Sequence, residues 1–214
     1  MRLLAITPIC VDAEELARRQ ARYDRLAPVG VRVHLENLGS DSQAPRALET
    51  AADVEASEVV LLERYAASDV AGYDAFLPDC VLDPLVGRGL ELGAPVLGIG
   101  RLTAQYLLAL DATLGAVARN EAIASELDRK LASYGTPLSL DTLVLDLSVD
   151  DIADDATWTG AVGRATSRLD CDYVFNACSA VEVGAGGRRP LVVDPTVVAL
   201  RLLGVQHSMT SVPT

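Results

Sequence analysis

The chain has 214 residues, of which half are hydrophobic and 22% are charged. Thirty acidic residues against 18 basic ones give a formal net charge of −12, and such a field repels phosphate backbones and anionic membranes. We therefore expect no nucleic-acid partner, and no apolar run approaches the roughly 18 residues that a membrane-spanning helix needs. The length allows one large domain or two lobes of about 100 residues each.

The cysteines and histidines follow neither a metal-binding nor a disulfide pattern. The four cysteines are Cys10, Cys80, Cys171 and Cys178, and they include no C-x-x-C pair. With only two histidines in the chain, we expect no zinc site. So few cysteines in a chain of this size indicate reduced thiols rather than a disulfide scaffold, and we expect a cytoplasmic protein.

Short apolar runs alternate with helical stretches, a pattern typical of parallel sheets that are covered by helices. In the first half, strands are expected over residues 3–9, 31–38, 75–80 and 95–100. Helices are expected to begin near Asp12, where Glu15 completes a potential capping box, at Pro45, and at Asp83-Pro84. A further helix over residues 103–110 ends this half.

The second half repeats this order. Strands are expected over residues 114–118, 142–147, 173–178 and 191–193, helices over 120–134 and 148–169, and a short helix after Pro195, before a loose polar tail from His207. This order predicts an α/β protein of two pseudo-symmetric lobes, each with a mostly parallel four-stranded sheet flanked by helices. The first lobe is expected to hold residues 1–100 and roughly 196–214, and the second lobe residues 101–195, with the active site in the cleft between them.

An internal repeat places one cysteine in each lobe. Residues 74–80 align with residues 172–178 at an offset of 98 residues, and both segments are expected to be strands that end in a cysteine. Cys80 and Cys178 then lie at the carboxyl ends of parallel strands, where α/β proteins bind ligands. The dipole of the helix expected at Asp83-Pro84 favours a thiolate at Cys80.

A thiolate and a thiol on opposite sides of a carbon acid form a general base and a general acid, and their roles exchange between the two enantiomers. The competing interpretation is that each cysteine is a small buried hydrophobic residue.

Four motifs occur in one order along almost the whole chain: Cys-Val-Leu-Asp-Pro at 80–84, Pro-Val-Leu-Gly-Ile-Gly at 95–100, Ala-Cys-Ser-Ala at 177–180 and Val-Asp-Pro at 193–195. In this order the chain resembles the aspartate/glutamate/hydantoin racemase superfamily, and within it the hydantoin racemase group. The resemblance implies a cofactor-independent racemase or epimerase of two pseudo-symmetric lobes, with Cys80 and Cys178 as paired acid and base. Its substrate would be a hydantoin-like or amino-acid-like small molecule, deprotonated at a carbon beside a carboxylate or an amide carbonyl. We also expect a homo-oligomer.

The positions that contact substrate in this family are changed. Residues 7–10 read Thr-Pro-Ile-Cys where hydantoin racemases have Asn-Pro-Asn-Thr, and Ala118-Arg119 replaces a threonine pair. The substrate contacts expected here are Ile9, Cys10, Val81, Arg119 and Ser179. Arg119 is expected to pair with a substrate carboxylate. Proton transfer is therefore better supported than any particular substrate.

Several other signals compete with this interpretation. Gly98-x-Gly100-x-x-Thr103 partly matches a dinucleotide-binding fingerprint, and the glycine-rich segment 183–189 could bind an anion through its amides. The aspartates at 150, 151, 154 and 155 fit no calcium loop, so a solvated helix face is expected. We expect a structural role for His34, a packing role for Trp158 and no reactivity at Cys171.

The alternative functions on the same fold are cis-trans isomerisation and decarboxylation of activated dicarboxylates. The alternative from another class is a small-molecule binding protein that has lost catalysis.

Overall fold

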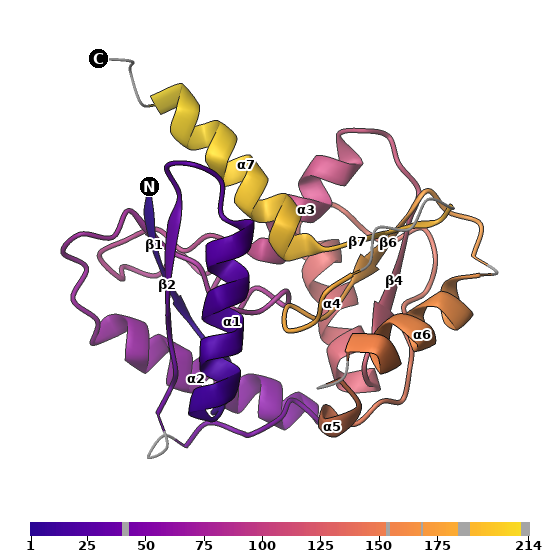
Figure 1. Cartoon of the computed structure of the whole chain (residues 1–214), viewed down its shortest axis with the longest axis horizontal. Helices are drawn as coiled ribbons and strands as arrows, with labels where there is room; N and C mark the ends of the chain where they lie inside the picture. The colour runs from indigo at the N-terminus through magenta and orange to yellow at the C-terminus, as the bar shows by residue number, and fades with distance from the viewer. Residues whose placement is uncertain (40–42, 153–154, 168, 184–188, 211–214) are drawn as a thin grey trace.

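The computed structural model describes residues 1–39, 43–152, 155–167, 169–183 and 189–210. As predicted, they form an α/β protein with two parallel sheets flanked by helices (Figure 1). The first sheet has the order β2-β1-β3, built from β1 (Arg2–Ile6), β2 (Arg32–Glu36) and β3 (Ala75–Phe76). The second has the order β5-β4-β6-β7, built from β4 (Leu114–Ala118), β5 (Leu143–Val144), β6 (Tyr173–Asn176) and β7 (Leu191–Val193).

In the described part of the chain, the first sheet has three strands rather than the predicted four. Among the described residues, the expected strand over 95–100 reduces to one parallel bridge between Phe76 and Val96, because α3 (Ile99–Leu108) begins three residues later. The strand expected over 75–80 ends at Phe76. Leu77 and Asp79 still donate to carbonyls of β1, but Pro78 has no N–H with which to extend the pairing toward the segment after Pro95. Cys80 therefore lies in a loop beyond the strand, and Cys178 lies in the corresponding loop beyond β6.

The helix predicted at Asp83-Pro84 is absent. Residues 81–87 form turns, and both Asp83 (φ +51°) and Leu85 (φ +68°) have left-handed backbone, which a right-handed helix cannot contain. The buried Asp83 carboxylate instead accepts hydrogen bonds from the N–H groups of Gly100 and Arg101, at 2.8 and 2.6 Å. Asp83 therefore caps α3 rather than starting a helix of its own.

The first helix after the leading strand of each lobe is α1 (Ala13–Leu26) or α4 (Glu121–Ser133), and each has a side-chain cap. Asp12 accepts a hydrogen bond from the Glu15 amide, as predicted, and Asn120 does the same for Ile123. α2 (Ala51–Ala66) begins later than the Pro45 that was expected to open it, because Thr50 and Asp53 form a complete capping box.

The helix predicted over residues 148–169 is described as two segments, α5 (Val149–Ile152) and α6 (Asp155–Thr166), and residues 153–154 lie outside the described part. Ser148 and Asp151 exchange the predicted capping hydrogen bonds. Trp158 is 1% exposed and packs in the core of the second lobe, also as predicted.

The last helix, α7 (Pro195–Thr210), is long rather than short, and it includes His207 at the start of the predicted loose tail. It leaves β7, packs along α3 and ends beside the amino terminus of the first lobe (Figure 1). Gly204 permits this approach, because a Cβ there would lie 2.5 Å from Pro28 Cγ. None of the described helices is long and apolar enough to cross a membrane.

Candidate active site

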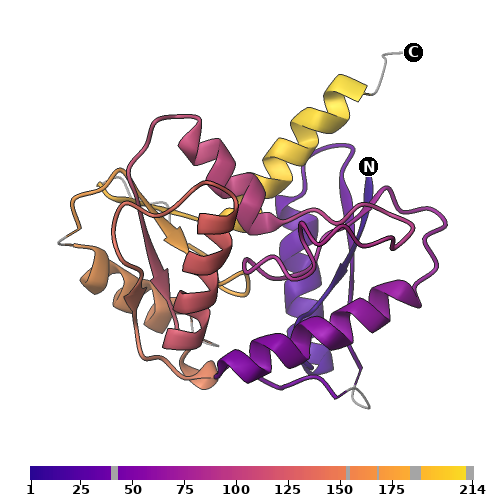
Figure 2. The same ribbon diagram turned by 180° about the vertical axis from the view of Figure 1, so that it is seen from behind.

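A cleft of about 640 Å³ opens between the lobes at the carboxyl ends of the strands. Seen from behind, the chain that follows β3 lies between the first lobe and α4 (Figure 2). The cleft is lined by all of the site residues expected from the sequence: Ile9, Cys10, Cys80, Val81, Arg119, Cys178 and Ser179. The fold thus brings these residues together from four separate stretches of the chain.

Another groove, of about 940 Å³, lies between α1 and β2 on the first lobe, but neither Cys80 nor Cys178 lines it. His34 lies there and contacts the Tyr73 hydroxyl, which agrees with its expected structural role. Cys171 is buried in the second lobe with Trp158, where its thiol donates to the Tyr173 carbonyl, and it does not line the cleft.

Cys80 and Cys178 are free thiols at equivalent positions in the two lobes. Each follows the strand that lies beside the leading strand of its lobe, β3 beside β1 and β6 beside β4. In each loop the backbone N–H two residues later, that of Leu82 or Ala180, hydrogen-bonds to the sulfur and lowers the pKa of the thiol. Such a backbone donor stabilises a thiolate whenever one forms.

The charges around the two sulfurs differ. Burial, together with the nearby carboxylates of Asp79 and Asp83, raises the pKa of Cys80 to about 12. Burial also raises the pKa of Cys178, but Arg19, Arg119 and Arg22 lower it. The expected thiolate at Cys80 relied on the helix that is absent, so the electrostatics instead favour Cys178 as the thiolate and Cys80 as the thiol.

A charged network that sequence analysis missed lies behind Cys80. Arg19 of α1 forms ion pairs with Glu15, at 2.6 Å, and with the buried carboxylate of Asp79, at 3.0 Å. The Tyr23 hydroxyl donates to the other Asp79 oxygen at 2.7 Å. Because Asp79 directly precedes Cys80, this network fixes the start of the cysteine loop.

The segment after Cys178 is held by the same helix. Arg18 donates to the Ala180 carbonyl at 2.8 Å, and Arg22 donates to the Ser179 carbonyl at 2.9 Å. The Ser179 hydroxyl donates to the Asp79 carbonyl at 3.1 Å, so it is already engaged beside Cys80. The signal for these contacts was a row of arginines at helical spacing, which by itself indicates only one face of α1.

Arg119, expected to pair with substrate, already has a carboxylate partner. Its buried guanidinium contacts Glu49 at 2.8 Å and the Leu48 carbonyl at 3.0 Å, which ties the end of β4 to the segment before α2. By contrast, the exposed Arg46 lines the cleft without a hydrogen bond or ion pair to any described residue.

The partial dinucleotide fingerprint has another explanation. The amides of Gly100 and Arg101 that would face a phosphate are bonded to Asp83. A Cβ at Gly98 would lie 2.6 Å from the Asp83 carboxyl carbon, and one at Gly100 would lie 2.3 Å from the Val81 carbonyl oxygen. These glycines therefore allow the Cys80 loop to pack closely against the start of α3. The amides at this end of the helix are already hydrogen-bonded and cannot bind a phosphate.

The other competing signals lie only partly within the described residues. In the described part of the chain, no group of three histidine, cysteine or acidic side chains is arranged to hold a metal ion. The Asp151 carboxylate is used in capping α5, and Asp154 lies outside the described residues. Most of the glycine-rich segment, residues 184–188, also lies outside them.

No protein-family model and no curated protein sequence matches the chain. Solved structures do match it over nearly its whole length. An allantoin racemase from Klebsiella pneumoniae has a TM-score of 0.73 at 16% identity, covering 100% of this chain and 90% of that one. An allantoin racemase from Pseudomonas fluorescens has a TM-score of 0.75 at 15% identity, covering 98% and 92%. The maleate isomerase Iso from Pseudomonas putida S16 has a TM-score of 0.63 at 14% identity, covering 97% and 93%.

The chain has the Asp/Glu racemase fold. A Picrophilus torridus aspartate racemase and an arylmalonate decarboxylase also share it. This agrees with the superfamily that the four sequence motifs indicated. In the Asp/Glu racemase fold of this chain, the loops after β3 and β6 each bring one cysteine to the cleft.

Proposed function

We propose that the protein is a cofactor-independent racemase or epimerase in which Cys80 and Cys178 transfer a proton at a carbon next to a carboxylate or an amide carbonyl. The observation that carries the proposal is the presence of two free thiols, from equivalent loops of the two lobes, in one cleft. A two-base reaction needs one proton carrier on each face of the reacting carbon.

The reaction begins with Cys178 as thiolate and Cys80 as thiol. The Cys178 sulfur takes the proton from the substrate carbon, an S–H bond forms, and the electron pair of the broken C–H bond moves into the neighbouring carbonyl as an enolate. The Cys80 thiol then gives its proton to the opposite face of that carbon. The product is the other enantiomer, and the enzyme is left with a Cys80 thiolate and a Cys178 thiol, which is the form that accepts this enantiomer.

The substrate class follows from the carbonyl that must accept the electron pair, and hydantoin-like or amino-acid-like compounds carry one. The structural neighbours named for allantoin and aspartate support this class. For an anionic substrate, Arg46, which has no ion pair with any described residue, is a better contact than Arg119, whose charge is opposed by Glu49. We also infer a cytoplasmic homo-oligomer.

The experiment is a solvent-exchange screen in D₂O with single enantiomers of 5-substituted hydantoins, allantoin and aspartate, followed by NMR and chiral chromatography. We expect one deuterium to enter the product enantiomer as optical activity is lost. Cys80→Ala and Cys178→Ala should each abolish racemisation, while each retains proton exchange on the enantiomer that faces the remaining thiol. Racemisation that survives the loss of either cysteine would refute the paired mechanism.

The same assay with maleate and an arylmalonate as added substrates separates the alternatives. A maleate-type cis-trans isomerase uses a thiolate as nucleophile, so it would convert the double bond without taking deuterium from solvent. The maleate isomerase among the structural neighbours gives this alternative its support. A decarboxylase would release carbon dioxide, and an inactive binding protein would bind one equivalent of ligand without turnover.

A further inference from the structure

The loop that carries Cys80 is held by a buried cation from the opposite lobe. Lys130, the only lysine in the chain, lies on α4 of the second lobe and is 6% exposed. Its Nζ donates to the Asp83 carbonyl at 2.8 Å, three residues after Cys80, and lies 3.8 Å from Glu58 of α2. A buried ammonium is costly unless its partners are fixed, so this contact holds the loop in one position.

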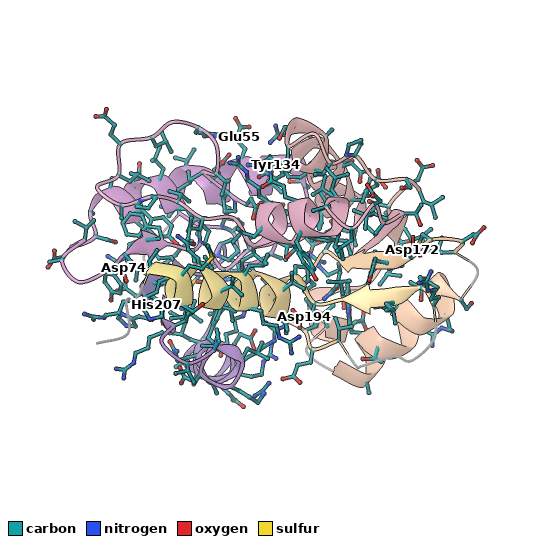
Figure 3. The ribbon with its side chains drawn as sticks, turned by 90° about the horizontal axis from the view of Figure 1, so that it is seen from above. Glu55, Asp74, Tyr134, Asp172, Asp194 and His207 are labelled. Carbon is teal, nitrogen blue, oxygen red and sulfur yellow. The ribbon has the colours of Figure 1, made fainter. Side chains whose placement is uncertain are left out.

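The loop that carries Cys178 is held in the same way from the other side. Arg22 lies on α1 of the first lobe and is 4% exposed. Its Nη2 donates to the Val181 carbonyl at 3.2 Å, three residues after Cys178, and also pairs with Asp194 of the second lobe. Figure 3 labels Asp194, from this contact, at the start of α7, and Tyr134, which donates to Asp83 in the other contact, away from that helix.

The two contacts are equivalent in the repeat. Arg22 is the tenth residue of α1 and Lys130 is the tenth residue of α4, and these helices follow the leading strands of their lobes. In each case a buried cation meets the carbonyl of the third residue after the cysteine. The same contact at both pseudo-symmetric positions indicates that it positions the cysteine loops. Stabilisation of the core alone would not require equivalent contacts in the two lobes.

We propose that Lys130 and Arg22 are paired positioning residues, each of which fixes the cysteine loop of the opposite lobe and so sets the separation of the two sulfurs across the cleft. The catalytic consequence rests on the proposed function, whereas the effect on the loops does not. If two sulfurs must reach opposite faces of one carbon, a loop that drifts by about 1 Å slows proton transfer without weakening binding.

Amide hydrogen exchange of the full chain, followed by mass spectrometry of peptides, tests the loops directly. Lys130→Met should raise exchange in the peptide over residues 80–86 by about tenfold, and leave the peptide over 178–183 within about twofold. Arg22→Met should give the reverse. Lys130→Arg, which retains a charged donor, should restore most of the protection. Arg129→Met is the matched control, because Arg129 adjoins Lys130 but is exposed and, within the described part of the chain, forms an ion pair with Glu126 alone.

Equal changes in both cysteine peptides, or no change in either, would overturn the proposal. If Lys130→Met does not fold, Tyr134→Phe removes the other α4 hydrogen bond to Asp83 and should loosen the same peptide alone. In any racemisation assay that responds, Lys130→Met should lower kcat about tenfold with KM within about twofold. Exchange changes without racemase activity would refute the proposed function only; activity with unchanged exchange would refute the positioning role only.

Discussion

Two identical side chains, Cys80 and Cys178, meet opposite charges in the cleft. Burial raises the pKa of both thiols; carboxylates beside Cys80 add to this rise, whereas arginines near Cys178 oppose it. A racemase of this kind needs one protonated and one ionised sulfur at the start of each turnover. The unequal surroundings make Cys178 the first of the two thiols to ionise as the pH rises.

The rate should therefore rise with pH. Because burial raises the pKa of Cys178 above the usual cysteine range, we expect kcat/KM for both enantiomers to increase through the alkaline range as the thiolate forms. It should fall again only where Cys80 loses its proton, at a pH of about 12. Arg119→Gln removes a positive charge near Cys178, so the rising limb should move to higher pH. Arg129→Met should leave it in place, and a shift of the Arg119 variant to lower pH would contradict this assignment.

A pair of glycine substitutions tests how closely the Cys80 loop meets α3. A Cβ at Gly100 would lie 2.3 Å from the Val81 oxygen, so Gly100→Ala should lower the free energy of unfolding by about 2 kcal/mol and disturb Cys80. In α6, Gly163 has nothing within 4 Å of a Cβ, and Gly163→Ala should raise that free energy by about 0.5 to 1 kcal/mol. Calorimetric melting of the two variants measures whether each change stabilises or destabilises the fold. A Gly100→Ala variant that is more stable than the wild type would count against the described packing.

Among the helices and strands, those with complete local signals were predicted well. Asp12 and Asn120 begin their helices as their sequences indicate, and the alternation of strands and helices gave the two sheets. The prediction of a helix at Asp83-Pro84 was wrong. It was made because Asp followed by Pro is a typical start of a helix. The Asp83 carboxylate is instead captured by amides at 100 and 101, a contact that no local pattern contains.

Some residues of the candidate site could likewise be predicted from the sequence, and others could not. The two cysteines could be found because a sequence repeat and a set of motifs mark them. Arg19, Arg22 and Lys130 could not, because their partners lie in the other lobe or far along the chain. A charged residue on a helix has the same local pattern whether it faces solvent or a docked neighbour.

The Asp83 cap should make stability depend on pH. Burial raises the pKa of Asp83 from 3.8 to about 6 in the folded chain, so its protonated form favours folding and this contribution is lost as the pH rises through about 6. Relative to Asp83→Asn, the wild type should lose about 2 kcal/mol of unfolding free energy between about pH 4 and about pH 7. Urea titrations of both proteins across this range measure the difference. A difference that grows with pH would show that the carboxylate, rather than the acid, stabilises the fold.

Across the whole molecule, the lobes are joined through polar contacts on both sides of the cleft. Arg22 and Ser179 connect the first lobe to the Cys178 loop, while Lys130 and Arg119 connect the second lobe to the chain around Asp83 and Glu49. Losing these contacts would leave buried charges unpaired. The lobes should therefore not open independently.

Denaturation can test this coupling, because Trp158 is the only tryptophan and lies in the second lobe. In urea, Trp158 fluorescence and far-ultraviolet circular dichroism, which reports both lobes, should give one coincident transition. The double variant Arg22→Met/Lys130→Met should separate the two curves, while Arg129→Met should keep them together. Separate transitions already in the wild type would show that the lobes are independent.

The burial of Lys130 also determines how the protein reacts with amine-specific reagents. With no other lysine in the chain, an N-hydroxysuccinimide ester finds a single side-chain amine, and in the closed molecule that amine is 6% exposed and bonded to Asp83. Acylation at residue 130, distinguished from the amino terminus by peptide mass, therefore counts the molecules whose lobes have separated. A substrate that draws the lobes together should slow this acylation, so one chemical footprint can rank candidate ligands before any turnover is detected.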